Sequence, residues 1–166
     1  MIEDFQLSMR HLAGAVNVIT AGSGEDAAGL TATAVCSLSM TPPRLLVCIN
    51  RSGATFAALC RSDRFCVNVL GIAAQDIAEA FAGRSGLTGR EKFASSDWIV
   101  EDGRPPRFAQ AISAVHCTVH SLQVVGTHAV VIGDVVQVAN RLDQHPLIYQ
   151  DRAFQTLRAL ADVTAG

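Results

Sequence analysis

The segment from Gly29 to Asn50 constrains the fold more than any other part of the chain. It reads GLTATAVCSLS, then MTPP, then RLLVCIN. Side chains of a β-strand point alternately to its two faces, and apolar residues recur at every second position from Leu30 to Leu38. Proline has no N–H to donate to a ladder, so Pro42-Pro43 ends this strand. The segment therefore predicts one strand over 29–39 and another over 44–50.

The remaining chain continues with short strands and a few helices. Two long strand patterns, 111–125 and 128–140, are joined by Gly126-Thr127, which is a hairpin signal. The other strands are expected over 15–22, 65–70, part of 97–107, and 146–149. Helices are expected over 3–12, 54–62, 73–83 and 152–160, with Ser52 as an N-cap and Gly83 as a C-cap. About six strands in hairpin succession predict a mainly β (α+β) antiparallel barrel with short helical inserts, forming a single domain over 1–166.

The composition is apolar for a chain of this length. Hydrophobic residues make up 49% and charged residues 17%, where ~25% charge is typical. The longest uncharged stretch, Phe108 to Gly133, is interrupted by glutamine and histidine, whereas a spanning helix needs ~20 predominantly apolar residues. The N-terminal segment has acids and no basic region of a signal peptide. We therefore expect no membrane span and predict a cytoplasmic oligomer that buries the extra apolar surface.

Charge and cysteine content exclude other classes. The net charge is −2 and no basic stripe is present, which argues against a nucleic-acid partner. The cysteine count is odd, and the chain contains no C-x-x-C. Such cysteines are expected to be reduced core residues. They are Cys36, Cys48, Cys60, Cys66 and Cys117.

The sequence contains partial matches to several common functional motifs, but none of them is complete. AGSGEDAAG contains G-x-G, but the third glycine of a dinucleotide fingerprint is misplaced and no helix follows. GRSGLTGREK lacks the Gly-Lys-Ser/Thr of a P-loop. His116 and His120 lie in a strand pattern, where four residues span ~13 Å, too far to share one zinc ion. We therefore expect no metal site. No nucleophile motif of the G-x-S-x-G type is present.

The segment from Gly29 to Asn50 and the turn after it also carry side chains that suit a bound ligand. Between Thr31 and Ser39, one strand face carries small hydroxyl side chains that would let a flat ligand approach the backbone. A helix that begins at Gly53 presents free N–H groups and the positive end of its dipole, which suits a phosphate. From the residues alone a plain alternative stays open: Ser52 is only a cap and the Thr-rich segment is only a good strand.

An ordered series of motifs extends this interpretation. GLTATAVCSLSMTPPRLLVCINRSGATF, FCVNVL, DIAEAF, GREKF, GTHAVVIGDV and PLIY follow one another along the chain. Over roughly Phe5 to Leu160 the chain resembles the flavin reductase family, the small reductase components of two-component flavin-dependent monooxygenases. The resemblance implies a split β-barrel that binds FMN or FAD and works as a homodimer.

The resemblance also implies roles for individual residues. One group would line the isoalloxazine ring and the start of the ribityl chain: Thr31, Ala32, Thr33, Ala34, Val35 and Ser37. A second group would take the ribityl and phosphate end: Asn50, Arg51, Ser52 and Thr55. Lys92 and Phe93 match the family's "KF" position, near the phosphate or the far half of the cofactor. His128 matches the position that faces the nicotinamide, and Tyr149 lies near the same pocket. Tyr149 is followed by Gln-Asp-Arg-Ala, whereas the family often has a glycine-containing turn there.

The function implied is an NAD(P)H:flavin oxidoreductase that transfers hydride from NADH to the flavin and supplies reduced flavin to a partner monooxygenase. The flavin carries the chemistry and the protein places the reactants, so no strong acid or base is needed. FMN versus FAD and NADH versus NADPH stay open. One alternative is a non-enzymatic flavin-binding domain on the same barrel. Another is an oxidase-type barrel for a pyridoxal-like substrate, which would need more arginine and lysine residues than this chain can spare.

Overall fold

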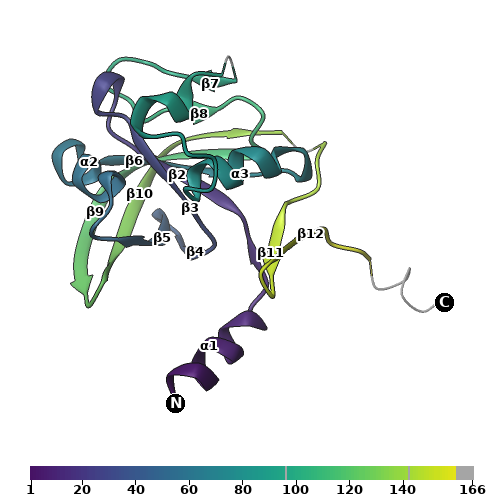
Figure 1. Ribbon diagram of the computed structural model, residues 1–166. Helices are drawn as coiled ribbons and strands as arrows, with labels where there is room; N and C mark the ends of the chain where they lie inside the picture. Colours follow the sequence, from purple (N-terminus) through teal and green to yellow (C-terminus); the bar gives the residue numbers. More distant parts are fainter. Residues whose placement is uncertain (96, 142, 160–166) are drawn as a thin grey trace.

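An antiparallel seven-stranded sheet forms the body of the computed structural model, which describes residues 1–95, 97–141 and 143–159 (Figure 1). Its spatial order is β3-β2-β6-β9-β10-β5-β4. The bounds are β2 (Asn17–Ala21), β3 (Ala28–Ala32), β4 (Val35–Met40), β5 (Pro43–Asn50), β6 (Arg64–Val69), β9 (Ser113–Val125) and β10 (His128–Asn140). The two edge strands, β3 and β4, are joined by only Thr33 and Ala34. The edges must therefore lie close together, and the sheet curls into a barrel that is split between β3 and β4.

The expectation of one strand over 29–39 is wrong. The chain breaks at Thr33-Ala34, where the Val35 N–H donates to the Thr33 carbonyl at 2.9 Å. β3 pairs with β2, whereas β4 pairs with β5. The recurrence of apolar residues at every second position continues across the break, because the chain is extended on both sides of it. It does not reveal that the halves belong to opposite edges of the sheet.

Two small sheets flank the barrel. One contains β1 (Gly14–Ala15), β11 (Ile148–Gln150) and β12 (Ala153–Gln155), and the other contains β7 (Trp98–Ile99) and β8 (Arg107–Phe108). The helix expected over 152–160 is wrong within the described residues, and residue 160 lies outside them. Residues 153–155 instead pair with β11, and the rings of Tyr149 and Phe154 pack at 5.3 Å. Pairing with a neighbouring strand thus outweighs the helical pattern of this segment.

The part of the chain that the structure describes contains three α-helices, as expected for the N-terminal, second and third helical segments: α1 (Ile2–Arg10), α2 (Ala54–Ser62) and α3 (Gln75–Phe81). Short 3₁₀ turns occupy η1 (Gly24–Asp26), η2 (Ile72–Ala74) and η3 (Gly89–Phe93). None of the helices among the described residues is long and apolar enough to cross a membrane. In Figure 1, α1 stands apart from the barrel, beside the β11–β12 hairpin.

The two predicted helix caps have different outcomes. Gly83 lies just past the end of α3 with φ +79°, and the N–H of Arg84 reaches back to the Glu79 carbonyl, as in a Schellman motif. Ser52 is not the N-cap of α2, because that position belongs to Gly53. The N–H and hydroxyl of Ser52 instead both donate to the Asn50 side-chain oxygen, at 2.9 and 2.8 Å.

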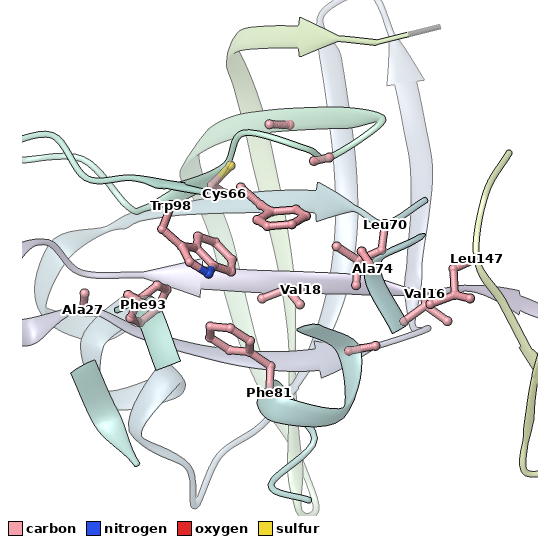
Figure 2. Close-up of a cluster of buried hydrophobic side chains, with 14 residues drawn as sticks. Val16, Val18, Ala27, Cys66, Leu70, Ala74, Phe81, Phe93, Trp98 and Leu147 are labelled. Carbon is pink, nitrogen blue, oxygen red and sulfur yellow. The ribbon is translucent and has the colours of Figure 1, made fainter. Parts of the chain in front are cut away.

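The central strands are buried on both faces. Ile19, Phe65 and Val67 face the barrel interior, where Ala58 and Leu59 of α2 join them. The opposite face of β2 and β6 is covered by an aromatic cluster that contains Phe81, Phe93, Trp98 and Phe108. Figure 2 shows the rings of Phe81, Phe93 and Trp98 gathered over Val18, with centroids 5.0–5.1 Å apart. The aromatic cluster thereby fixes α3 and η3 on the sheet.

The cysteine expectation holds only in part. All five cysteines are free, but only Cys66 and Cys117 are buried, and Cys48 is half-buried. Cys36 and Cys60 are exposed, so their assignment to the core is wrong. Cys36 lies on the edge strand β4, and Cys60 lies on the outer face of α2.

Asn68 offers a test of the two-sided core. This side chain is fully buried; it donates to the Val18 carbonyl at 3.0 Å and accepts from the Phe108 N–H at 2.7 Å. Asn68→Ala removes one buried hydrogen bond from each of these two backbone groups and leaves a cavity, so we expect the free energy of unfolding to fall by about 2–4 kcal/mol in urea titrations. Asn140→Ala is the matched control, because Asn140 is exposed and accepts one bond from Ser113. Equal effects of the two substitutions would contradict this account.

Candidate cofactor-binding site

Four of the predicted site residues line one pocket of about 220 Å³. They are Thr31, Ala32 and Thr33, at the end of β3, and Tyr149 on β11. Val16, Ala82, Arg84 and Phe154 complete the lining. We call this the cofactor pocket. Its walls combine small side chains at the end of β3 with two aromatic rings from the β11–β12 hairpin.

Hydrogen bonding explains how the cofactor pocket is assembled. The Thr31 hydroxyl donates to the Ala78 carbonyl at 2.7 Å and so ties α3 to β3. The left-handed residue Gly83 then turns the chain, which places Arg84 at the pocket wall. A Cβ on Gly14 would lie 2.8 Å from the Thr33 Cβ, so glycine is needed for β1 to pass this close to the pocket.

A second group of predicted residues surrounds the turn between β5 and α2. His128 lies opposite Asn50 in the β5–β10 ladder, and the Arg51 N–H donates to the Thr127 carbonyl at 3.1 Å. The Thr127 hydroxyl lies 2.9 Å from the His128 Nδ1. Asn50, Arg51, Ser52 and His128 are all exposed. The structure therefore brings the predicted phosphate-end residues and the predicted nicotinamide-facing histidine to one surface.

The start of α2 is the anion-favouring part of this surface. The first N–H groups of a helix have no partner within it, and the helix dipole is positive there. Arg51 adds a guanidinium next to this end, and Asn50 holds Ser52 in place. Thr55, in the first turn, is only 3% exposed, so its side chain faces the core more than the surface.

Residues 34–37 lie between the cofactor pocket and this turn. The Ala34 carbonyl accepts from the Cys48 N–H at 3.0 Å, and Cys48 precedes Asn50 by two residues, about 7 Å along a strand. Val35 is half-buried and Ser37 is exposed. His128, however, does not line the cofactor pocket that contains Tyr149. A single chain therefore does not bring the two predicted nicotinamide-side residues into one pocket.

Lys92 and Phe93 pack against Phe81, which adjoins the cofactor pocket. Phe93 is buried in the aromatic cluster, and the Lys92 ammonium lies 5.6 Å from the centroid of the Phe81 ring. Phe81 is followed directly by Ala82, which lines the pocket. Neither Lys92 nor Phe93 is itself among the lining residues.

Sequence reasoning missed four lining residues: Val16, Ala82, Arg84 and Phe154. Phe154 was assigned to a helix, so its packing on Tyr149 was not expected. Arg84 follows the predicted helix end at Gly83, and a left-handed residue there redirects the chain toward the sheet. That turn was the one available signal for Arg84.

Buried titratable groups lie in the sheet, outside the cofactor pocket. Burial raises the pKa of the Cys117 thiol to about 12 and also raises that of Cys66, so both stay protonated at neutral pH. Burial, followed by the charges of Arg104 and Arg107, lowers the pKa of His116. Among the described residues, no three His, Cys, Asp or Glu side chains gather closely enough to hold a metal ion. The Arg51 guanidinium and the N–H groups at the start of α2 suit binding of an anionic group.

Comparisons with known proteins agree with this geometry. Residues 9–158 match the model of the flavin reductase like domain. The chain is 38% identical over 153 residues to FMN reductase (NADH) RutF 1 of Methylorubrum extorquens, covering 92% of this chain and 75% of the relative.

Solved structures show the same fold. A flavin reductase from Haemophilus somnus superposes with a TM-score of 0.87 at 30% identity, covering 95% of this chain and 99% of that one. Nitrilotriacetate monooxygenase component B from Mycobacterium thermoresistibile gives a TM-score of 0.83 at 26% identity, covering 95% and 87%. These matches confirm the predicted split-barrel fold and the resemblance noted from the sequence. The chain belongs to the flavin reductase like domain family.

Proposed function

We propose that this protein is an NADH-dependent flavin reductase that reduces FMN by hydride transfer. The observation that carries the proposal is the cofactor pocket, where small β3 residues face an aromatic wall inside a chain of the flavin reductase like family. A 38% identical relative is named an FMN reductase (NADH), which favours FMN over FAD and NADH over NADPH. We further propose that residues 1–166 act as one domain, which the match over 9–158 supports.

The residues present fit a flavin. Ala32 and Thr33 leave room for a flat ring, and the backbone at Thr33-Ala34 is exposed where the chain crosses between sheet edges. The exposed turn Asn50–Ser52 and the start of α2 offer N–H groups and a guanidinium to a phosphate. A bound flavin supplies the hydride acceptor, and the nicotinamide supplies the hydride. The protein's part is to hold the two rings at reacting distance and exclude other orientations.

His128 has a positioning role in this proposal. Its backbone is fixed opposite Asn50, and its ring lies beside the Thr127 hydroxyl. An exposed imidazole at this point can donate or accept a hydrogen bond with the nicotinamide carboxamide. Tyr149 and Phe154 form the aromatic side of the neighbouring pocket.

We propose that the reduced flavin passes to a separate oxygenase. The solved structure of a nitrilotriacetate monooxygenase component B, a protein of the same fold, supports this partner class.

We also propose a homodimer. Apolar side chains are exposed on β4 and α1, with Met40 81% and Phe5 62% exposed. The two exposed free thiols, Cys36 and Cys60, are consistent with a reducing, cytoplasmic setting.

The first test is NADH oxidation at 340 nm with purified protein, with and without FMN, FAD or riboflavin. We expect oxidation to depend on added flavin and to be most efficient with FMN. Tight FMN binding without NADH consumption would reject the enzyme and leave a flavin-binding domain.

His128→Ala tests the positioning role. We expect kcat/KM for NADH to fall about 10–100-fold while the Kd for FMN changes less than about twofold, because the histidine orients the nicotinamide rather than the flavin. His120→Ala is the control on the same hairpin, since His120 is also exposed and bonds to Arg44 and Asp134. A parallel loss of FMN affinity in His128→Ala would place this histidine in flavin binding instead.

Met40→Glu tests the homodimer. Sedimentation of the unmodified protein should give twice the mass of one chain. A charge placed at an apolar interface costs several kcal/mol, so Met40→Glu should shift the protein to monomer. A monomeric unmodified protein would refute the proposed assembly.

A further inference from the structure

The turn between β11 and β12 carries an unusual backbone. Asp151 and Arg152 both have left-handed conformations, with φ of +46° and +64°. Two central residues of this kind make a type I′-like hairpin turn, for which Asn-Gly is strongly preferred because glycine has no Cβ penalty. Arginine has neither the freedom of glycine nor the short polar side chain of asparagine. The turn therefore favours Gly at 152 on backbone grounds, yet it holds an arginine.

Arg152 lies in a second cavity that adjoins the cofactor pocket. This groove, of about 370 Å³, runs between α1 and the β11–β12 hairpin and shares Thr33 and Tyr149 with the cofactor pocket. The Asp151 N–H donates to the Arg10 carbonyl at 3.1 Å, so the strained turn also holds the end of α1. Figure 1 shows one end of α1 close to the turn of this hairpin. A molecule lying in the cofactor pocket could extend directly into the groove.

The charge of the groove selects the group that would enter it. Arg10 and Arg152 both line it, together with one carboxylate, Asp151, and Arg84 lines the adjoining pocket. Within residues 1–95, 97–141 and 143–159, neither Arg10 nor Arg152 forms an ion pair. The excess of guanidinium groups suits a phosphoryl group, which arginine can bind through two parallel hydrogen bonds.

The two arginines differ in what the fold itself requires. Arg10 lies in the last turn of α1, where a cation is favoured by the helix dipole, so it has a structural reason to be there. Arg152 has no such reason, since its backbone conformation opposes any side chain. A residue kept in a strained conformation beside a binding pocket points to a role in binding.

We propose that Arg152, together with Arg10, binds a phosphoryl group of the nucleotide whose ring occupies the cofactor pocket, and so sets nucleotide specificity. This inference rests on the proposed function, because that function defines the nucleotides. The phosphoryl group belongs either to the nicotinamide nucleotide, with the flavin phosphate at the turn Asn50–Ser52, or to the flavin, in which case that turn does not bind the flavin phosphate.

The experiment compares Arg152→Gly with Asp151→Gly. Both substitutions relieve a left-handed residue of the same turn, so both should raise the Tm by about 1–4 °C. Only Arg152→Gly removes the cation. Binding is measured without turnover, as the Kd of FMN and of riboflavin by fluorescence quenching and the Kd of NAD⁺ by calorimetry. The KM for NADH is then measured with riboflavin as acceptor.

We expect Arg152→Gly to weaken binding of one phosphorylated ligand about 5–20-fold, and Arg152→Lys to weaken it less. Asp151→Gly removes the one carboxylate that lines the groove, so this variant should bind the same ligand at least as tightly as the unmodified protein. Weaker NAD⁺ binding and a higher KM for NADH would assign the site to the nicotinamide nucleotide. Weaker FMN binding with riboflavin unchanged would assign it to the flavin phosphate.

Three results would overturn the inference: unchanged affinities in Arg152→Gly, an equal loss for riboflavin, or an equal loss in Asp151→Gly. A fall in Tm for Arg152→Gly would refute the strain on which the argument depends. If the unmodified protein binds these nucleotides but does not oxidise NADH, the proposed reductase activity fails while the role of Arg152 is still decided by the Kd values.

Discussion

The passage of the chain from one sheet edge to the other is the constraint on which the rest of the structure depends. β3 and β4 are the two edges of a seven-stranded sheet, yet only Thr33 and Ala34 separate them. With two linking residues, the last residue of β3 and the first of β4 are three residue steps apart, at most about 11 Å in an extended chain, so the sheet has to curl until its edges nearly meet. The same link leaves the backbone of Thr33 and Ala34 exposed at the opening between β3 and β4, which we call the seam. It also places the end of β3 beside β1 and β11, where the cofactor pocket forms.

Burial on both faces of β2 and β6 then fixes what surrounds the seam. The aromatic cluster anchors α3, and the hydrogen bond from the Thr31 hydroxyl to the Ala78 carbonyl fixes the position of that helix relative to β3. Arg84 reaches the pocket only because α3 ends where it does. Residues deep in the fold, such as Phe81 and Phe93, therefore shape the pocket without lining it. Core packing thus fixes the position of α3, and the position of α3 fixes which residues form the pocket wall.

Much of this fold could be predicted from the sequence, because hairpins and helix ends are local. The turns at Gly126-Thr127 and at Gly83 can be recognised from the residues within a few positions of them in the sequence. The break at Thr33-Ala34 could not be predicted, since both sides of it are extended and the reason for it is a distant pairing partner. The same holds for Phe154, whose neighbour Tyr149 lies across a hairpin turn that lacks glycine. Site residues such as Thr31 and Tyr149 were found together through the family pattern, whereas Arg84 depends on tertiary placement.

The distribution of apolar surface connects composition with the incomplete site. A chain that is 49% hydrophobic and 17% charged fills both faces of its central strands and still leaves Leu38, Met40 and Phe5 exposed. These residues lie on β4, which is one edge of the sheet, and on α1. His128 and Tyr149, both expected near the nicotinamide, lie in different parts of one chain's surface. A second copy packed on β4 and α1 would cover the exposed side chains and enclose the seam at once. The proposed homodimer would thus account both for the exposed apolar side chains and for the separation of His128 from Tyr149 on one chain's surface.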